Sequence, residues 1–398
     1  MRVATAHAFD TSLDALTKRQ REMTEAQMQL STGKRVNRAS DDPAAAAQAE
    51  RALSKSARAD ASQRAAESSR NMMTLTEGAM GEAGELLQQV REALVAGGNA
   101  TYTDVERQGV AQKVAGLREQ LLAIANRSDG AAGYLFGGQG SSQPPFVDTT
   151  TGVQFRGTAG QISAASEDNL PLSADGRSVW LAARTGNGVF ETKAITSTGT
   201  AFVDAGQVTQ PAALTGSSYS IQFGINAGVT SYSVLKDGVA TVQTDVPFTS
   251  GKAIEVDGMS VTIKGAPAAG DEFQMVPSTP TQSVFGLLDR AVASLNTPLR
   301  GGAQIAQSNS NDLRDIDSVL GQLQSSRSLA GDALNRVDSV SSRLDSVKLQ
   351  ASVERSDAED LDMVQAISNF QNQQTGYEAA LKSYSMVQRL SLFQYLNV

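Results

Sequence analysis

The side chains that could act as catalytic groups in this chain are scattered acids and a single histidine. A pair of carboxylates can act as general acid and general base in a hydrolytic reaction. The candidates lie in the middle of the chain, at Asp168, Asp175, Asp257, Asp271 and Glu272. Each lies in or beside turn-like sequence, where acidic residues are common for conformational reasons. The sequence therefore supports an enzyme, such as a hydrolase or glycan-active module, only as a minor hypothesis.

Other chemistries have even less support. The chain has no cysteine, so disulfides, thiolate nucleophiles and cysteine metal sites are excluded. His7 is the only histidine, which argues against a histidine triad or a zinc site. The acidic pair Asp41–Asp42 suits a helix start better than a metal site or an acid–base pair. The glycine-rich GGQGSS at residues 137–142 has no P-loop lysine and reads as a linker. We expect no cofactor and no metal.

Composition narrows the classes of partner. The chain has 398 residues, a formal net charge of −8 and a pI near 4.9, which argues against binding nucleic acid through a basic face. No run approaches the roughly 18 apolar residues of a membrane span, so membrane insertion is not expected. The N-terminal sequence has no continuous apolar region and no convincing cleavage site. We therefore expect no cleaved secretory signal.

Any functional surface must be carried by the helices and strands of the chain. The most informative of these is the last stretch, residues 361–398. It has no proline and predicts one helix with a heptad-like stripe, in which Gln374 fills the one missing turn. The apolar stripe consists of Met363, Ile367, Phe370, Tyr377, Leu381 and Tyr384. The extreme C-terminus is apolar as well, at Leu390, Leu392, Phe393, Tyr395 and Leu396. Such a terminus should be disordered alone and ordered against a partner.

A second helix with an unsatisfied face is predicted at the N-terminus, over residues 5–33, ending at Gly33. Glutamines at positions 20 and 27 dilute its seam, so it suits packing in a larger bundle rather than existing alone. The a/d-type positions of this seam are Phe9, Leu13, Leu16, Met23 and Leu30.

Two further helical regions flank the middle of the chain. The segment LSTGKRVNRASDDPAAAAQAE, residues 30–50, predicts a helix start, with Ser40 or Asp41 as the cap and Pro43 in the first turn. That helix should run to about residue 94, and a second should follow the glycine break at 97–98. Helical stripes return after residue 282, over 285–295, 313–323 and 334–347.

The sequence pattern in the middle of the chain predicts an all-β domain. Eight of the ten prolines and 19 of the 35 glycines lie between residues 136 and 282. Two Asp-Gly pairs, at 237–238 and 257–258, predict hairpins with two-residue turns. Short strands are expected at residues 153–156, 178–181, 219–223 and 231–235.

The fold class expected is therefore α+β multidomain, with paired terminal helices and an inserted all-β domain. Residues 1–40 and 358–398 should form terminal coiled-coil helices that are disordered in the monomer and ordered on assembly. Residues 41–134 and 283–357 should form a helical bundle. Residues 135–282 should form the β domain.

Both ends of the chain resemble known signatures. The segment at residues 30–50, with Arg35, Asn37, Asp41, Asp42 and Pro43, is similar to the N-terminal signature of the bacterial flagellin superfamily. The segment AISNFQNQQTGYEAALKSYSMVQRLSLFQYL, near the other end, is similar to the C-terminal signature of the same superfamily. Three features resemble the hook–filament junction branch rather than filament flagellin, namely Pro43, YLFGG at 134–138 and the ending LSLFQYL. GDEFQMVPS at 270–278 also resembles that branch.

The resemblance implies a structural role without catalysis. The terminal helices would line an inner tube, and the β domain would project outward. The subunits would associate into a ring at the end of the hook, with hook-associated protein 1 below and flagellin above. A flagellar export chaperone would bind the C-terminal region. The protein would be extracellular, exported without a cleaved signal by the flagellar type III pathway. The alternatives are a filament-forming flagellin and, less favoured, an enzyme in the β domain.

Overall fold

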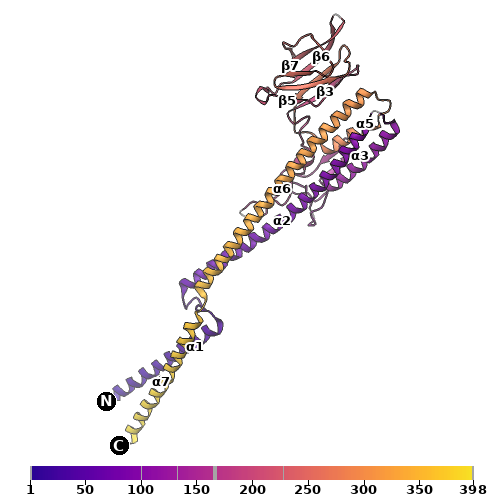
Figure 1. Ribbon diagram of the computed structural model, residues 1–398. Helices are drawn as coiled ribbons and strands as arrows, with labels where there is room; N and C mark the ends of the chain where they lie inside the picture. Colours follow the sequence, from indigo (N-terminus) through magenta and orange to yellow (C-terminus); the bar gives the residue numbers. More distant parts are fainter. Residues whose placement is uncertain (1, 100, 132, 165–167, 227, 397–398) are drawn as a thin grey trace. The chain divides into compact units, whose positions relative to one another are not determined.

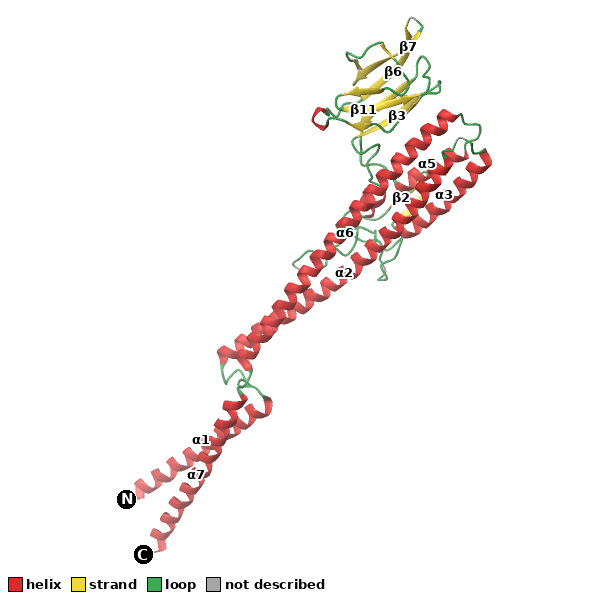
Figure 2. Ribbon diagram, viewed as in Figure 1, coloured by secondary structure: helices red, strands yellow, loops and turns green. Residues whose placement is uncertain are grey.

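The computed structural model describes residues 2–396 apart from 100, 132, 165–167 and 227, and gives only the backbone for residues 2–6, 8, 9 and 387–396. The chain divides into two compact units, one of residues 1–64 with 340–398 and one of residues 65–339. Helices form both ends of the chain and strands form the middle (Figures 1 and 2), which confirms the α+β class. No described helix is both long and apolar enough to cross a bilayer.

The first unit is helical. Helices α1 (Arg2–Thr32) and α7 (Met363–Leu396) lie side by side, and the two chain ends lie at the same end of this pair (Figure 1). The unit also holds the start of α2 (Pro43–Gly97) and the end of α6 (Gly302–Glu359). These two helices are joined by exposed ion pairs, Lys55–Glu354 at 3.3 Å and Lys348–Asp60 at 2.7 Å. A small buried cluster consists of Val36, Ala45, Ala49 and Ala358.

A helical bundle forms the first part of the second unit. It contains the rest of α2 and α6 with α3 (Asp104–Ala125) and α5 (Val284–Asn296). Helix α3 begins with a capping box, in which Thr103 and Glu106 satisfy each other's backbone N–H groups. Apolar residues at helical spacing from all four helices close a dry core, whose fully buried members include Leu87, Val90, Val114, Leu121, Phe285, Leu288 and Ile316.

The segment from residue 135 to 183 packs onto this bundle and not into the β domain. It contains β1 (Phe146–Thr149), β2 (Gly152–Phe155) and the short helix α4 (Gly176–Trp180). Trp180 stacks on Phe285 of α5 with ring centroids 5.8 Å apart, and Phe136 meets Trp180 edge-on at 5.4 Å. The boundary expected at residue 135 is therefore wrong for the β core, which begins at Phe190.

Two local expectations for this segment are also wrong. The strand expected at residues 178–181 is part of α4, because the Asp175 carboxylate accepts the backbone N–H of Arg177 and starts a helical turn that buries Val179 and Trp180. The GGQGSS segment is a packed turn and not a linker. Gly138 has a left-handed backbone with φ +67°, and an added Cβ would lie 1.8 Å from the Thr158 carbonyl oxygen.

The β domain consists of two antiparallel sheets that enclose one core. One sheet has the order β3-β12-β6-β7-β8, with β9 on β7; the other has the order β10-β11-β4, with β5 on β11. Both predicted hairpins are confirmed, with Asp237, Gly238, Asp257 and Gly258 all at positive φ. The strands are β3 (Phe190–Thr196), β4 (Phe202–Val203), β5 (Gln207–Val208), β6 (Tyr219–Asn226), β7 (Val229–Lys236), β8 (Val239–Ala240), β9 (Val246–Pro247), β10 (Ala253–Val256), β11 (Met259–Lys264) and β12 (Glu272–Pro277).

Candidate assembly site

The seam between α1 and α7 is built from half-buried side chains. On α7 the half-buried positions Ala366, Phe370, Gln373, Tyr377, Ala380 and Tyr384 follow alternating spacings of four and three. The matching half-buried positions on α1 are Ser12, Leu16, Met23, Ala26 and Leu30. Gly376 faces the Arg19 guanidinium, since an added Cβ there would lie 3.9 Å from it. Among the described side chains of these two helices none is fully buried. The pair therefore has a seam but no dry core.

The stripes predicted from the sequence split between this seam and the surface. The seam contains Leu16, Met23, Leu30, Phe370, Tyr377 and Tyr384. The structure places four predicted positions outside the seam, between 41% and 46% exposed: Leu13, Met363, Ile367 and Leu381. The remaining six side chains lie outside the described residues: Phe9, Leu390, Leu392, Phe393, Tyr395 and Leu396.

The seam residues that the apolar stripe does not predict are small or polar. Ala26, Ala366 and Ala380 permit a close approach of the two helices, and Gln373 takes the place expected for Gln374. A stripe defined by large side chains alone passes over these positions. Alanine at heptad spacing is the signal that would have found them.

Five apolar side chains of α7 lie outside the seam and are uncovered, among polar neighbours. Val364 is 83% exposed and Met386 is 64% exposed, beside the three half-exposed residues Met363, Ile367 and Leu381. We call these five residues the uncovered flank. Several large apolar side chains left in water on a helix that already has one partner are typical of a surface that meets a further partner.

The two short connections that follow α1 and precede α7 are joined by backbone pairing. Lys34 and Asp360 form an antiparallel bridge, and Leu361 N–H donates to the Gly33 carbonyl at 3.0 Å. Arg35 N–H donates to the Glu359 carbonyl at 2.6 Å, and the Lys34 ammonium lies 2.7 Å from the Glu359 carboxylate. Gly33 has φ +69° and ends α1 as predicted. The two connections therefore form one hydrogen-bonded joint.

Signature residues hold this joint and start α2. The Asp42 carboxylate accepts the N–H groups of Ala44 and Ala45 at 3.1 and 3.0 Å, so the cap is Asp42 and not Ser40 or Asp41. Pro43 is the first residue of the helix, as expected. The Arg35 guanidinium lies 3.1 Å from Asp42 and also donates to the Ala358 carbonyl at 2.8 Å.

Asp41 has a different role. Its carboxylate accepts the backbone N–H groups of Asn37 and Arg38 at 3.1 and 2.8 Å, closing the loop before α2. The hydrogen bond from the Arg38 backbone is the main cause that lowers the pKa of Asp41. The hydrogen bond from the Ala45 backbone does the same for the pKa of Asp42. Both carboxylates therefore stay ionised as turn and cap acceptors, which is not the environment of a proton-transfer pair.

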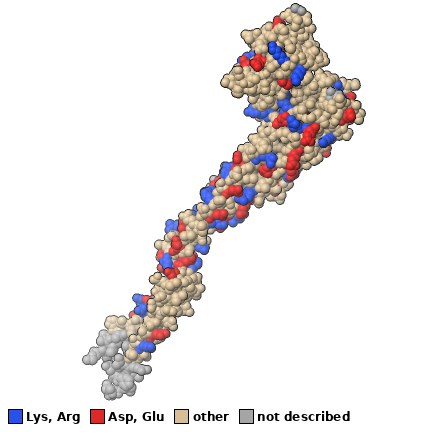
Figure 3. Space-filling view, in the orientation of Figure 1, with Lys and Arg blue, Asp and Glu red and all other residues tan. Residues whose placement is uncertain are grey.

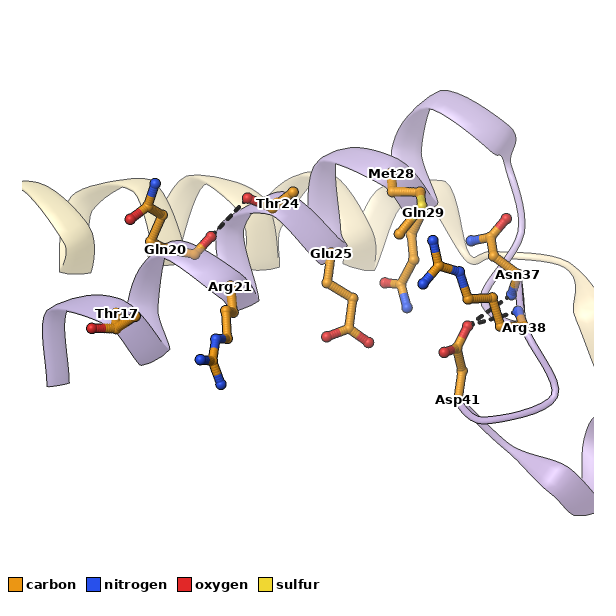
Figure 4. A pocket seen from close by; sticks show the side chains of 10 residues that line it. All are labelled: Thr17, Gln20, Arg21, Thr24, Glu25, Met28, Gln29, Asn37, Arg38 and Asp41. Atoms are coloured by element: carbon orange, nitrogen blue, oxygen red, sulfur yellow. Dashed lines mark hydrogen bonds between the residues drawn. The ribbon is translucent and has the colours of Figure 1, made fainter. Parts of the chain in front are cut away.

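A polar groove of about 430 Å³ opens between α1 and this loop (Figure 4). Residues of both charges line it, so it suits polar contacts with a neighbouring chain rather than a single charged ligand. We call it the junction groove. Its lining residues are Thr17, Gln20, Arg21, Thr24, Glu25, Met28, Gln29, Asn37, Arg38 and Asp41.

The candidate catalytic acids hold local structure. Asp257 accepts from the Tyr219 hydroxyl at 2.6 Å and from Lys236 at 2.7 Å, and the bonds from Lys236 and Tyr219 lower its pKa. Burial acts to raise the pKa of Asp271, but hydrogen bonds from the backbone of Thr198, Ala268 and Gly199 hold it below its usual value. Gln274 and Ser220 bind the Glu272 carboxylate.

The remaining polar candidates show no site either. Asp175 caps α4. His7 is exposed, and its Nδ1 lies 3.5 Å from the Thr11 hydroxyl. Within the described residues no group of three or more His, Asp or Glu could hold a metal ion. Acidic and basic side chains are interspersed over the visible face of the helices (Figure 3).

Comparison with known protein families supports the resemblance of both chain ends to bacterial flagellins. The model of the bacterial flagellin N-terminal helical region matches residues 4–141, and that of the C-terminal helical region matches residues 282–396. The chain is 24% identical over 400 residues to flagellar hook-associated protein 3 of Salmonella typhimurium, a match that covers 99% of both chains.

Solved structures agree with this similarity. The crystal structure of hook-associated protein 3 from Legionella pneumophila matches with a TM-score of 0.71 at 26% identity, covering 76% of this chain and 97% of that one. The flagellar junction protein from the same organism matches with a TM-score of 0.62 at 28% identity, covering 70% of this chain and 94% of that one. Since the matches include both helical ends and extend across the whole chain, the protein belongs to the bacterial flagellin family.

Proposed function

We propose that this chain is a structural subunit of the bacterial flagellum that forms the junction between the hook and the filament. It associates with itself into a ring, with hook-associated protein 1 on one side and flagellin on the other. The observation that carries this proposal is the uncovered flank of α7, on a helix pair whose described side chains form no dry core. The full-length similarity to hook-associated protein 3 supports it.

The mechanism is folding coupled to assembly. In the free subunit the terminal pair gains little from its thin seam, so its ends fray. On assembly, neighbouring subunits cover the uncovered flank, and each half-exposed Met, Ile or Leu side chain contributes about 1 kcal/mol as its remaining surface is buried. These contributions offset the entropy lost on ordering the two helices. The junction groove supplies polar contacts that fix the register of the neighbour.

Export requires that the same apolar surface be masked beforehand. We propose that a flagellar export chaperone binds the C-terminal region and that the subunit leaves the cell by the flagellar type III pathway. The sequence of residues 390–396 supports this, since it places three leucines, a phenylalanine and a tyrosine in seven positions. A double variant, Leu390→Glu with Phe393→Glu, should lose chaperone binding or assembly while the β domain keeps its unfolding transition. Unchanged assembly and unchanged chaperone binding would contradict a role for this region.

We propose no catalytic activity. Four of the candidate acids, Asp175, Asp257, Asp271 and Glu272, are occupied as cap, turn and strand contacts, and the relatives in sequence and structure are flagellar components. Hydrolysis of a glycan or peptide by the purified chain would contradict this.

Immunogold electron microscopy of intact cells tests the location directly. An antibody against the β domain should label one narrow band between hook and filament. Labelling along the whole filament would instead identify a filament-forming flagellin, and purified subunits would then polymerise without limit. Gold on neither structure would overturn the proposal.

Limited proteolysis of the monomer tests the mechanism. Cleavage should remove roughly the first 40 and last 40 residues and leave a stable centre, because cleavage follows local opening. Resistance spread evenly along the chain would argue against folding on assembly.

A further inference from the structure

The connection between α5 and α6 presents a leucine to solvent. The side chain of Leu299 is 94% exposed, and among the described large apolar side chains only Val242 is more exposed. Val105, at the start of α3, is 76% exposed. The two segments are neighbours, because the Leu299 N–H donates to Oδ2 of Asp104 at 3.2 Å. Two large apolar side chains therefore lie in water at the end of the bundle where α3 and α6 begin.

The backbone of Leu299 is unusual for a leucine. Five non-glycine residues in the described part of the chain have a positive φ. Four of them are Asn or Asp, which tolerate this conformation, and the fifth is Leu299 at φ +58°. The left-handed backbone is unfavourable for most residues because Cβ lies too close to the following carbonyl oxygen. A bulky apolar side chain that is both strained and left in water indicates a role outside the free subunit.

Polar contacts hold the loop around Leu299 in place. The Arg300 guanidinium donates to the Ser294 carbonyl and hydroxyl at 3.1 and 2.7 Å, before the loop. It also donates to a carbonyl and a hydroxyl of α6 at 2.6 and 2.7 Å, after the loop. The Asp104 carboxylate, which accepts the Leu299 N–H, is held in turn by the buried Arg107 at 2.6 Å. Because the loop is already ordered, little conformational entropy is lost when Leu299 is covered.

A pocket on the same bundle fits a leucine side chain. It lies between α2, α6 and residues 161–179, and its volume is about 210 Å³. A dry apolar cavity of about 150 Å³ accepts a benzene-sized group, so the space is sufficient for a leucine. Most of the buried side chains that line the pocket are apolar. They include Met73, Met80, Val179, Ala330 and Ala333.

The charges around the pocket and around Leu299 are opposite. Arg336 of α6 lines the pocket, is exposed, and has no hydrogen bond or ion pair within the described residues. Glu106, next to Val105, is exposed and accepts hydrogen bonds from Thr103. Asp175 also lines the pocket, but its carboxylate is engaged as the cap of α4. The two surfaces are therefore complementary in size, polarity and charge.

We propose that Leu299 of one copy of this chain inserts into the pocket of the next copy. The two surfaces cannot meet within one chain, because α6 rises about 40 Å between its start and Leu329 at the pocket, at roughly 1.5 Å per residue. A contact between unlike surfaces repeats from copy to copy and builds a ring where the rotation closes. The inference rests on the proposed self-association and adds a second contact to it, on the bundle.

Cross-linking of introduced cysteines tests this contact, because the chain has no cysteine of its own. Leu299→Cys is combined with Leu329→Cys at the pocket, and isolated hook–filament structures are treated with a short bis-maleimide. A ladder of multimers of this chain is expected. The control combines Leu299→Cys with Leu349→Cys, which lies on the same helix and has the same exposure of 68% as Leu329. The control should give no ladder.

Three results would overturn the contact. They are the absence of a ladder from the assembled chain, a ladder of equal yield in the control, or an adduct with a different protein in place of the ladder. Immunogold labelling of the same cells distinguishes these results from failure of the proposed function. A chain that is present at the hook–filament band without a ladder overturns only the contact, whereas a natural chain that is absent from the band overturns both.

Leu299→Asn is the second variant and needs no cross-linking. Asparagine tolerates the left-handed backbone better than leucine, so the Tm of the monomer should not fall. The swarm of cells that carry only this variant should nevertheless be narrower than that of the natural strain, and Leu349→Asn should keep the natural swarm. A lower Tm would make Leu299 part of the fold of the subunit. A swarm of natural width would exclude Leu299 from the contact between copies.

Discussion

Helices α1 and α7 meet through half-buried side chains, whereas α2, α3, α5 and α6 enclose side chains that are fully buried. Both regions have helical spacing of apolar residues, yet only the bundle closes a dry core. The difference lies in the number of partners. A bundle helix is covered on two or more sides, while each terminal helix has one neighbour in the subunit, so part of its apolar surface stays in water.

This comparison predicts which region of the subunit is stable by itself and which region is stable only against neighbouring subunits. The bundle should unfold cooperatively with its own free energy. The terminal pair should contribute little to the stability of the monomer and much to the stability of the assembly. Substitutions in the two regions, and at the elements that hold them, test this contrast.

The largest loss of stability is expected from a substitution that creates a cavity in the bundle. Leu121→Ala removes a fully buried side chain and should lower the free energy of unfolding by about 2–5 kcal/mol. Leu16→Ala, the matched truncation in the half-buried seam, should cost the monomer less than about 1 kcal/mol, since the site stays partly hydrated. Urea unfolding followed by circular dichroism measures both. Equal losses would remove the contrast between the two regions.

A smaller loss is expected at a buried polar anchor of the β domain. Asp271→Asn replaces an acceptor that satisfies three backbone N–H groups and should cost about 1–3 kcal/mol. Because the pKa of Asp271 is lowered in the fold, its contribution is present above about pH 4 and is lost as pH falls through the folded value. The variant should therefore show a shallower loss of stability on acidification. If the variant lost stability with falling pH as steeply as the natural protein, the pH-dependent contribution would come from another residue.

A loss of about 1 kcal/mol is expected at the end of α1. Gly33→Ala places a side chain at φ +69°, where it is strained although there is open space around it. Gly116→Ala, on the exposed side of α3 with equal space, should instead stabilise the bundle by about 0.5–1 kcal/mol. Thermal melts followed by the helical circular dichroism signal compare the two. Shifts of the same sign would mean that backbone strain at Gly33 is not what ends the helix.

The smallest effect on the monomer is expected on the uncovered flank. Ile367→Asp alters a half-exposed position, so the free energy of unfolding should change by less than about 0.5 kcal/mol. Assembly and motility should nevertheless be lost in cells that carry only this variant. Asn372→Asp, at an exposed polar position on the same helix, adds the same charge as a control and should assemble. Normal motility with Ile367→Asp would show that the uncovered flank is not part of the assembly interface.

Much of this architecture could be read from local pattern. Spacing of four and three predicted the terminal helices and the α3 stripe, and Gly33 and Pro43 marked helix ends. The two Asp-Gly pairs predicted the hairpins, because a positive φ at both turn residues is a local requirement. The paired signatures at the chain ends indicated the family before any fold was considered.

Other features depended on tertiary contacts. Residues 135–183 look like loop and strand sequence, but Trp180 and Phe136 join the bundle core because Phe285 of α5, much further along the chain, provides the complementary surface. The split of the terminal stripes, with Phe370 in the seam and Ile367 outside it, was likewise set by the opposite helix. Gly376 and the alanines of the seam are small, so they leave room for the side chains of the opposite helix.

Local sequence patterns were enough to predict most of the elements, the family and the presence of apolar faces that need partners, since periodicity and turn chemistry act over a few residues. Which of those faces is covered within the subunit depended on how distant segments pack together. That packing also placed the buried carboxylate of Asp315 between Arg314 and Arg290, which belong to different helices, because burial and charge proximity arise only when distant segments pack together.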